Sequence, residues 1–175
     1  MITIEPPQSL SLSGHSAITK PAVARFLAAA QKAVGLTGEV HVLLADDTTL
    51  KRLNKTFRGK NKATDVLSFP AGPSTVFFSE PDAPELVGDL AVSLESAARQ
   101  AHYFGHSLAD EVRILLLHGL LHLAGFDHET DSGEMAALEA ELRKKLELPT
   151  GLIARTKPGP ASSHSKPSTL RRARA

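Results

Sequence analysis

Residues 115–128, with the sequence LLLHGLLHLAGFDH, restrict the fold more than any other part of this chain. The run predicts a helix over residues 109–123 in which His118 and His122 lie one turn apart on the same face. Gly125 can take a left-handed conformation, which ends a helix and turns the chain back. That turn would bring His128 toward the helical pair. We therefore expect three imidazoles to converge at the end of one helix.

Three converging imidazoles form a ligand set for a transition metal. The chain contains no cysteine, so only histidine and oxygen donors are available. Three protein ligands leave a tetrahedral zinc ion one open position, which is typical of catalytic sites. We expect one zinc ion held by His118, His122 and His128, although imidazole also suits nickel, copper and iron. The alternative is that each histidine is a satisfied polar group at the end of a buried helix.

Zinc proteases with the motif H-E-x-x-H-x-x-G-x-x-H share this spacing of histidines and glycine. Their glutamate serves as the general base, and Gly119 occupies its position in this chain. Because glycine has no side chain to accept a proton, the sequence disfavours peptidase chemistry of that type.

Two acidic residues lie near the histidines in the sequence. Glu111, two turns before His118, could orient a metal ligand, but we favour a solvated acid that stabilises the helix N-terminus. Asp127 could orient a ligand or cap the turn, and both interpretations are kept.

The rest of the chain predicts a small sheet covered by helices. Strands are expected over residues 2–5, 39–45, 66–69 and 86–94, with a short one over 76–78 inside a Pro/Gly/Ser-rich loop. Helices are expected over residues 21–34, 48–57, 95–104, 109–123 and 132–148. Strands separated by helices, followed by a run of helices, indicate an α+β or α/β layer.

The formal net charge of +1 is distributed unevenly. Residues 151–175 contain 6 of the 20 basic residues and no acid, so residues 1–150 hold 14 basic and 19 acidic residues and carry about −5. We expect one domain over residues 1–150 and a disordered basic tail over residues 151–175. Such a tail either attracts nucleic-acid phosphates or is a dispensable extension.

The sequence predicts a soluble, cytoplasmic protein without a membrane partner. No stretch approaches the roughly 20 apolar residues that a membrane-spanning helix needs. The N-terminal residues also lack the basic and apolar regions of a signal peptide.

A second dense segment, RGKNKATDVLSFP at residues 58–70, places Arg58, Lys60 and Lys62 on a loop that leads into an apolar strand. Such a loop alone is commonly a solvated turn. Together with VGDLAVS and the histidine segment, it resembles the YbeY family of bacterial endoribonucleases and ribosomal-RNA maturation factors. The family pattern H-G-x-L-H-L-x-G-[FY]-D-H is filled from His118 to His128, and the resemblance covers about residues 39–148.

The resemblance implies a compact α+β fold with a central mixed sheet of about four strands flanked by helices. It also implies that His118, His122 and His128 bind the metal. Arg58 would line the same cleft as a catalytic, substrate-binding residue, with Lys60 and Lys62 as further substrate contacts. Asn61 and Ala63 depart from the acid and proline expected in that loop, which bears on loop rigidity and substrate preference.

The function implied by the resemblance is metal-dependent cleavage of single-stranded RNA in 16S ribosomal RNA maturation and ribosome quality control. The partners would be ribosomal RNA and the small ribosomal subunit or its proteins. Two nucleophiles fit these residues, an activated water and the RNA 2′-hydroxyl. Two other functions also fit: a non-catalytic ribosome-assembly factor with a structural metal, and a different zinc-dependent hydrolase acting on a small ester or amide.

Overall fold

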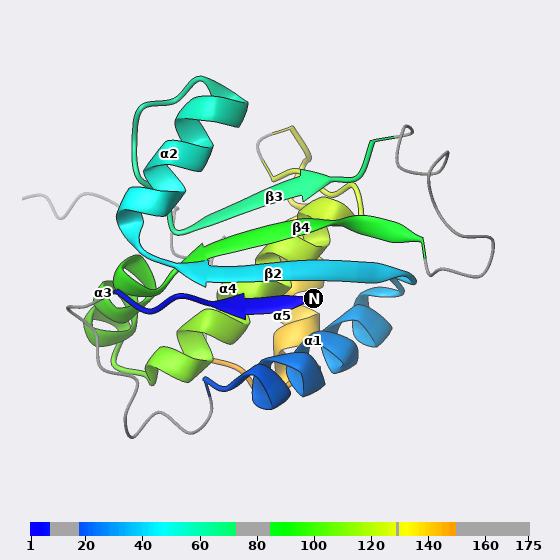
Figure 1. Cartoon of the computed structure of the whole chain (residues 1–175). Coiled ribbons are helices and arrows are strands. Elements are labelled where there is room, and N and C mark those ends of the chain that lie inside the picture. The colour runs from blue at the N-terminus through cyan, green and yellow to red at the C-terminus, as the bar shows by residue number, and fades with distance from the viewer. Residues whose placement is uncertain (8–17, 73–84, 129, 150–175) are drawn as a thin grey trace, which may run out of the picture.

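The protein is seen here as a computed structural model that describes residues 1–7, 18–72, 85–128 and 130–149. Within these ranges lie four strands and five helices (Figure 1). In chain order they are β1 Ile2–Ile4, α1 Lys20–Val34, β2 Glu39–Ala45, α2 Asp47–Arg58, β3 Val66–Pro70, β4 Leu86–Ser93, α3 Leu94–Phe104, α4 Leu108–Leu123 and α5 Glu134–Lys145. The strand expected over residues 76–78 and the basic tail lie outside the described residues, and so does the expected domain boundary at residue 150.

The four strands form one mixed sheet in the order β1-β2-β4-β3. Strands β1, β2 and β4 are parallel, whereas β3 runs antiparallel to β4 and forms one edge. This arrangement confirms the α+β fold with a central mixed sheet and flanking helices that the sequence predicts. The antiparallel register pairs Ser68 with Leu90 and Phe69 with Asp89.

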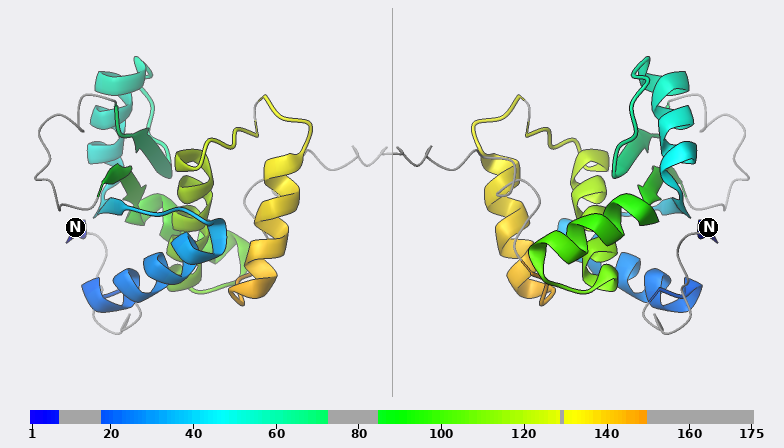
Figure 2. Two further views of the ribbon diagram at one scale, coloured as in Figure 1. Left: turned by 90° about the vertical axis from the view of Figure 1, so that its right-hand side faces the viewer. Right: turned by 90° about the vertical axis from the view of Figure 1, so that its left-hand side faces the viewer.

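Helices cover the two faces of the sheet unequally (Figure 2). Helices α1, α4 and α5 lie on one face, where α4 is buried almost completely from Val112 to Leu121. Helix α2 lies on the other face, and there Leu50 packs with Ala45, Leu67 and Ala91. Helix α2 packs against β3 and β4, and residues of β1 and β2 such as Thr3 and His41 line an open cleft on the sheet.

Helix α4 approaches the sheet very closely at two glycines. A Cβ atom on Gly119 would lie 2.7 Å from a Leu90 methyl group and 3.2 Å from Ser68 Oγ. A Cβ atom on Gly88 of β4 would lie 2.4 Å from the Phe69 carbonyl oxygen and 2.8 Å from a methyl group of Leu123. These contacts fix the C-terminal end of α4 against β3 and β4.

Helix α5 is shorter than the expected range of 132–148 at both ends. It begins at Glu134 because the Asp131 carboxylate accepts hydrogen bonds from the N–H groups of Gly133 and Met135, at 2.9 and 2.8 Å. It ends at Lys145 because Glu147 is left-handed, with φ of 55°. The other helices and strands agree with the expected ranges to within one residue at both ends.

No helix among the described residues is long and apolar enough to cross a membrane.

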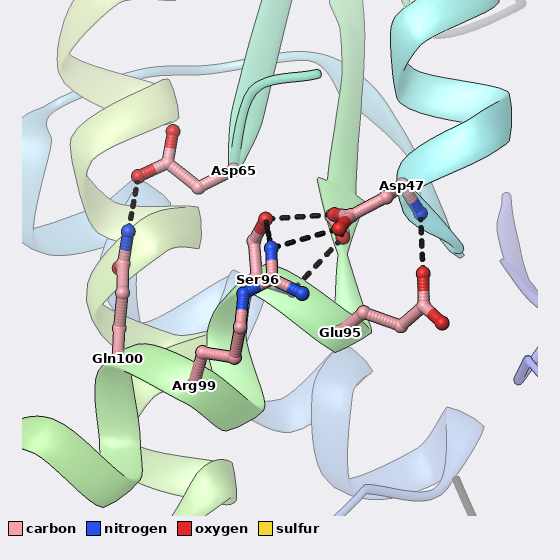
Figure 3. A network of polar contacts seen from close by, with 7 residues as sticks. Asp47, Asp65, Glu95, Ser96, Arg99 and Gln100 are labelled. Carbon is pink, nitrogen blue, oxygen red and sulfur yellow. Dashed lines mark hydrogen bonds and ion pairs between the residues drawn. The ribbon is translucent and has the colours of Figure 1, made fainter. Parts of the chain in front are cut away.

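Asp47, the first residue of α2, fixes that helix to α3 (Figure 3). Its Oδ1 accepts hydrogen bonds from the hydroxyl groups of Ser93 at 2.5 Å and Ser96 at 2.7 Å. Its Oδ2 pairs with Arg99 at 2.7 Å, and its N–H donates to Glu95 Oε2 at 3.0 Å. The start of α2 is therefore bound to the start of α3 through one partly buried carboxylate.

The far end of the segment that contains α2 is held to α3 as well. Gln100 Nε2 donates a hydrogen bond to Asp65 Oδ2 at 2.8 Å, and the Asp65 carbonyl accepts one from the Ser93 N–H at 2.8 Å. Asp65 precedes β3 directly. Helix α2 and the loop after it are thus anchored at both ends, as Figure 3 shows.

Replacing Asp47 with alanine is expected to lower the free energy of unfolding by about 1–3 kcal/mol, because two buried hydroxyl groups lose their acceptor. Asp110→Ala is the matched control: Asp110 also accepts from a serine and an arginine, but both lie within α4 or its cap. The control should cost less than 1 kcal/mol. Urea unfolding of both variants measures the difference, and equal losses would contradict the anchoring role.

The pH dependence of the Asp47 contribution follows from its pKa. Burial opposes ionisation of Asp47, but hydrogen bonds from Ser93, Ser96 and Arg99 outweigh it and hold the pKa below the ordinary 3.8. A carboxyl whose pKa is lower in the folded state stabilises the fold above the unfolded pKa. The difference between the wild type and Asp47→Ala should therefore narrow as the pH falls below about 4.

Candidate metal centre and cleft

The three histidines are brought together by the turn that ends α4. The Gly125 N–H donates to the His122 carbonyl at 3.0 Å, and the Phe126 N–H donates to the Leu121 carbonyl at 3.0 Å. Gly125 is left-handed, with φ of 91°. This pair of hydrogen bonds is the Schellman arrangement, in which a left-handed residue reverses the chain after a helix. The turn carries His128 back to the helix, as the sequence predicts.

The imidazole rings of His118, His122 and His128 form a compact triangle. Their ring centroids are 4.8, 5.2 and 5.3 Å apart, and one nitrogen from each ring lies within 4.8 Å of the other two. The Nε2 atoms of His118 and His122 are 3.2 Å apart. Nitrogens around a tetrahedral zinc ion at about 2.0–2.1 Å would be roughly 3.3 Å apart, so this pair already has the required separation.

The hydrogen bonding of His128 and the pKa of His122 suit metal binding. His128 Nδ1 is buried and makes no hydrogen bond to any residue that the structure describes, so no protein group competes with a metal for this nitrogen. Burial lowers the pKa of His122 below its ordinary value, and the neighbouring His118 and His128 lower it further. The imidazole of His122 is therefore neutral at pH 7, the form that binds metal ions. This three-histidine group can hold one metal ion.

Glu139 of α5 supports the group from behind. Its Oε2 lies 3.1 Å from Nδ1 of His118, and both side chains are buried. A carboxylate on the outer nitrogen orients the ring and leaves Nε2 directed toward His122 and His128. The sequence gives no signal for Glu139, because it lies 21 residues from its partner and no local pattern links the two.

The favoured interpretation of Glu111 as a solvated acid is wrong. Glu111 is fully buried and pairs with His106 at 2.5 Å. The loop before α4 brings His106 over the first turn of the helix, a return of the chain that helical periodicity cannot reveal.

Asp127 lines the same cleft as the three histidines. Its negative charge acts on His122, where it opposes the lowering of the His122 pKa.

Gly119 faces the sheet, in contact with Leu90 and Ser68. The Ser68 hydroxyl donates a hydrogen bond to the Gly119 carbonyl at 3.3 Å. A glutamate at this position would collide with β4 because even a Cβ atom lies 2.7 Å from Leu90. The close packing of α4 therefore supports the exclusion of the zinc-protease motif.

A cleft of about 1340 Å³ joins the histidines to the end of α2. It is lined by His118, His122 and His128 on one side and by Phe57 and Arg58 on the other. Arg58 is the last residue of α2, and its side chain is exposed. The structure thus brings Arg58 and the three histidines to one cleft.

Lys60 and Lys62 follow Arg58 but are not among the described residues that line the cleft. Both are exposed. The Asn54 side chain donates a hydrogen bond to the Lys62 carbonyl at 2.8 Å, which ties the loop to α2 through its backbone. The structure does not place these two lysines beside the histidines, so their role as substrate contacts stays a prediction.

The fold and the site together define an α+β protein with a three-histidine centre at the end of a buried helix, open to a cleft beside a mixed sheet. A family model described as endoribonuclease YbeY matches residues 9–147. The chain therefore belongs to the endoribonuclease YbeY family, which confirms the resemblance seen in the sequence.

Individual relatives agree with this assignment. A protein named endoribonuclease YbeY from Koribacter versatilis is 50% identical over 139 residues, which cover 79% of this chain and 85% of that protein. Another from Nautilia profundicola is 50% identical over 117 residues, 67% of this chain and 78% of that protein. A solution structure of a Thermotoga maritima protein matches with a TM-score of 0.50 and 25% identity, over 83% of this chain and 89% of that chain.

Replacing Glu139 with glutamine should weaken metal binding about 10- to 100-fold, because the amide orients His118 less well than a carboxylate. Glu141→Gln is the matched control, since Glu141 lies on the same helix but is exposed. Competition with a chelator of known affinity measures the change without any assay of activity. Equal metal affinity in the two variants would show that Glu139 does not support the centre.

Proposed function

We propose that this protein is a metal-dependent endoribonuclease that cleaves single-stranded RNA in the maturation of 16S ribosomal RNA and in ribosome quality control. Its cofactor would be one zinc ion held by His118, His122 and His128, and its partners ribosomal RNA and the small ribosomal subunit or its proteins. The observation that carries the proposal is that an arginine and three imidazoles line one cleft. Membership of the endoribonuclease YbeY family supports the reaction class.

The chemistry of the cleft suits a phosphodiester. When bound, a divalent cation at the three histidines would supply Lewis-acid chemistry to the phosphate and to the nucleophile, which is either a water or the RNA 2′-hydroxyl. Arg58 presents a planar, permanently charged fork that can hold two phosphate oxygens at once. Its guanidinium would stabilise negative charge as it builds on those oxygens during cleavage.

The surrounding residues keep these groups in place. Glu139 fixes the ring of His118, and the Gly125 turn fixes the position of His128 relative to α4. The Asp47 contacts with α3 hold the helix that carries Arg58. The metal ligands and the arginine come from separate elements, so their alignment depends on how α2 and α4 are held around the β3 edge.

Metal content and RNA cleavage measured together test the proposal. The intact protein should carry about one equivalent of metal, since a three-imidazole group is a complete ligand set for a catalytic zinc ion. It should also cleave single-stranded RNA in a way that chelation abolishes. His122→Ala should lose both properties, whereas His102→Ala, an exposed histidine on α3, should lose neither.

The outcomes separate the other functions. Metal without RNA cleavage, but with hydrolysis of a small ester or amide, would indicate a different metal-dependent hydrolase. Metal and RNA binding without any hydrolysis would indicate a ribosome-assembly factor with a structural metal. If the wild-type protein contains no metal and the His122→Ala variant is as stable as the wild type, the three histidines do not form a metal centre.

Arg58→Lys should lower the cleavage rate about 10- to 100-fold while leaving metal content unchanged. Lysine keeps the charge but loses the two-pronged geometry that holds two phosphate oxygens. Arg52→Lys is the matched control, because Arg52 is also exposed on α2 but does not line the cleft. Cleavage of one single-stranded RNA at one salt concentration measures the effect, and wild-type rates in Arg58→Ala would remove Arg58 from the active site.

A further inference from the structure

Phe57, in the last turn of α2, is 65% exposed although it shares a helical face with two apolar residues. Leu50 on that face is fully buried, and Leu53, one turn further along, is partly buried. Figure 1 shows the C-terminal end of α2 extending past the edge strand β3. The apolar face of α2 therefore leaves the sheet before it reaches Phe57, and the ring is presented to the cleft.

The Phe57 ring is exposed but packs against a second aromatic ring. It contacts Phe69 of β3 edge to face, with ring centroids 5.2 Å apart and an angle of 63° between the rings. An edge-to-face contact can cover at most one face of a ring. At least one face of Phe57 is therefore not covered by Phe69. An aromatic ring with an open face is a platform on which a planar group can stack.

Beside the two rings, the negative charge of Asp89 favours a neutral group over a phosphate. Asp89 lies opposite Phe69 in the β3–β4 register and lines the cleft; its Oδ1 is 3.2 Å from His41 Nδ1, and its side chain is 54% exposed. A carboxylate repels a phosphate at this end of the cleft. Arg58 immediately follows Phe57 and attracts one. An aromatic ring next to a guanidinium matches the alternation of base and phosphate along a nucleic-acid strand.

We infer that Phe57, backed by Phe69, stacks on an unpaired nucleobase of the RNA, while Arg58 holds a neighbouring phosphate. This inference rests on the proposed function and adds the means by which the cleft selects single-stranded RNA. A base within a duplex is already stacked on both faces and paired along its edge, so only an unpaired base can be offered to the ring. Phe57 is thus a substrate-binding residue that selects unpaired RNA.

Binding of a short, fluorescently labelled single-stranded RNA to the full-length, metal-loaded chain tests the inference. Fluorescence anisotropy is measured while the RNA is still intact, and a gel checks that no cleavage products have formed. Phe57→Ala should weaken binding about 10-fold, the loss expected for one base stack, whereas Phe57→Trp should stay within about 2-fold of the wild type. Tyr103→Ala is the matched control, because Tyr103 is 81% exposed, forms an edge-to-face pair with Phe104, and does not line the cleft.

A series of RNAs, each lacking the base at one position, then locates the stack. The wild type should lose affinity at one position, and Phe57→Ala should be insensitive to removal of that base. If the alanine variant melts early, Phe57→Leu carries the same test, because it keeps apolar bulk without an aromatic ring. The melting temperature of each variant is the check on folding.

The results separate this inference from the proposed function. If the wild type cleaves the RNA but Phe57→Ala and Phe57→Leu bind it as tightly as Tyr103→Ala does, the stacking inference is overturned and the endoribonuclease stands. If the wild type neither binds nor cleaves single-stranded RNA, the proposed function fails and the inference falls with it.

Discussion

Helix α4 lies so close to the sheet that two backbone positions must be glycine. A side chain at Gly119 would meet Leu90, and one at Gly88 would meet both the Phe69 carbonyl and Leu123. Close packing of this kind leaves the helix end little freedom, because a change of even one methyl group would displace it. His118 and the turn that follows are therefore held against β3. The geometry of the candidate metal centre therefore depends on this contact.

Much of the fold and the centre could be predicted from the sequence because their signals are local. The spacing of His118 and His122, and the left-handed turn at Gly125, act within one helix and its end. The roles of Glu139 and Glu111 could not be predicted, since their partners arrive through loops. The exposure of Phe57 could not be predicted either, because a helical pattern cannot show where a helix passes the edge of its sheet.

An acidic domain that acts on RNA must place its few attractive groups carefully. Residues 1–150 carry about −5, and carboxylates such as Asp89 and Asp127 line the cleft itself. Under the proposed function, phosphate is attracted to Arg58 and the metal centre, and the acidic side chains repel it from other positions in the cleft. Negative charge in the cleft would then restrict the path of the strand, so that register and selectivity come partly from repulsion.

Because α2 is attached to α3 through Asp47, the position of Arg58 in the cleft and the occupancy of the three-histidine site depend on different contacts. The three histidines that could hold a metal come from α4 and its turn, whereas Arg58 lies at the end of a helix anchored by a different set of hydrogen bonds. Damage to that anchor would move one wall of the cleft and leave the ligand set intact. Under the proposed function, a preparation could therefore hold its full complement of metal and still be inactive, so metal content alone would be a poor measure of how much competent enzyme a sample contains.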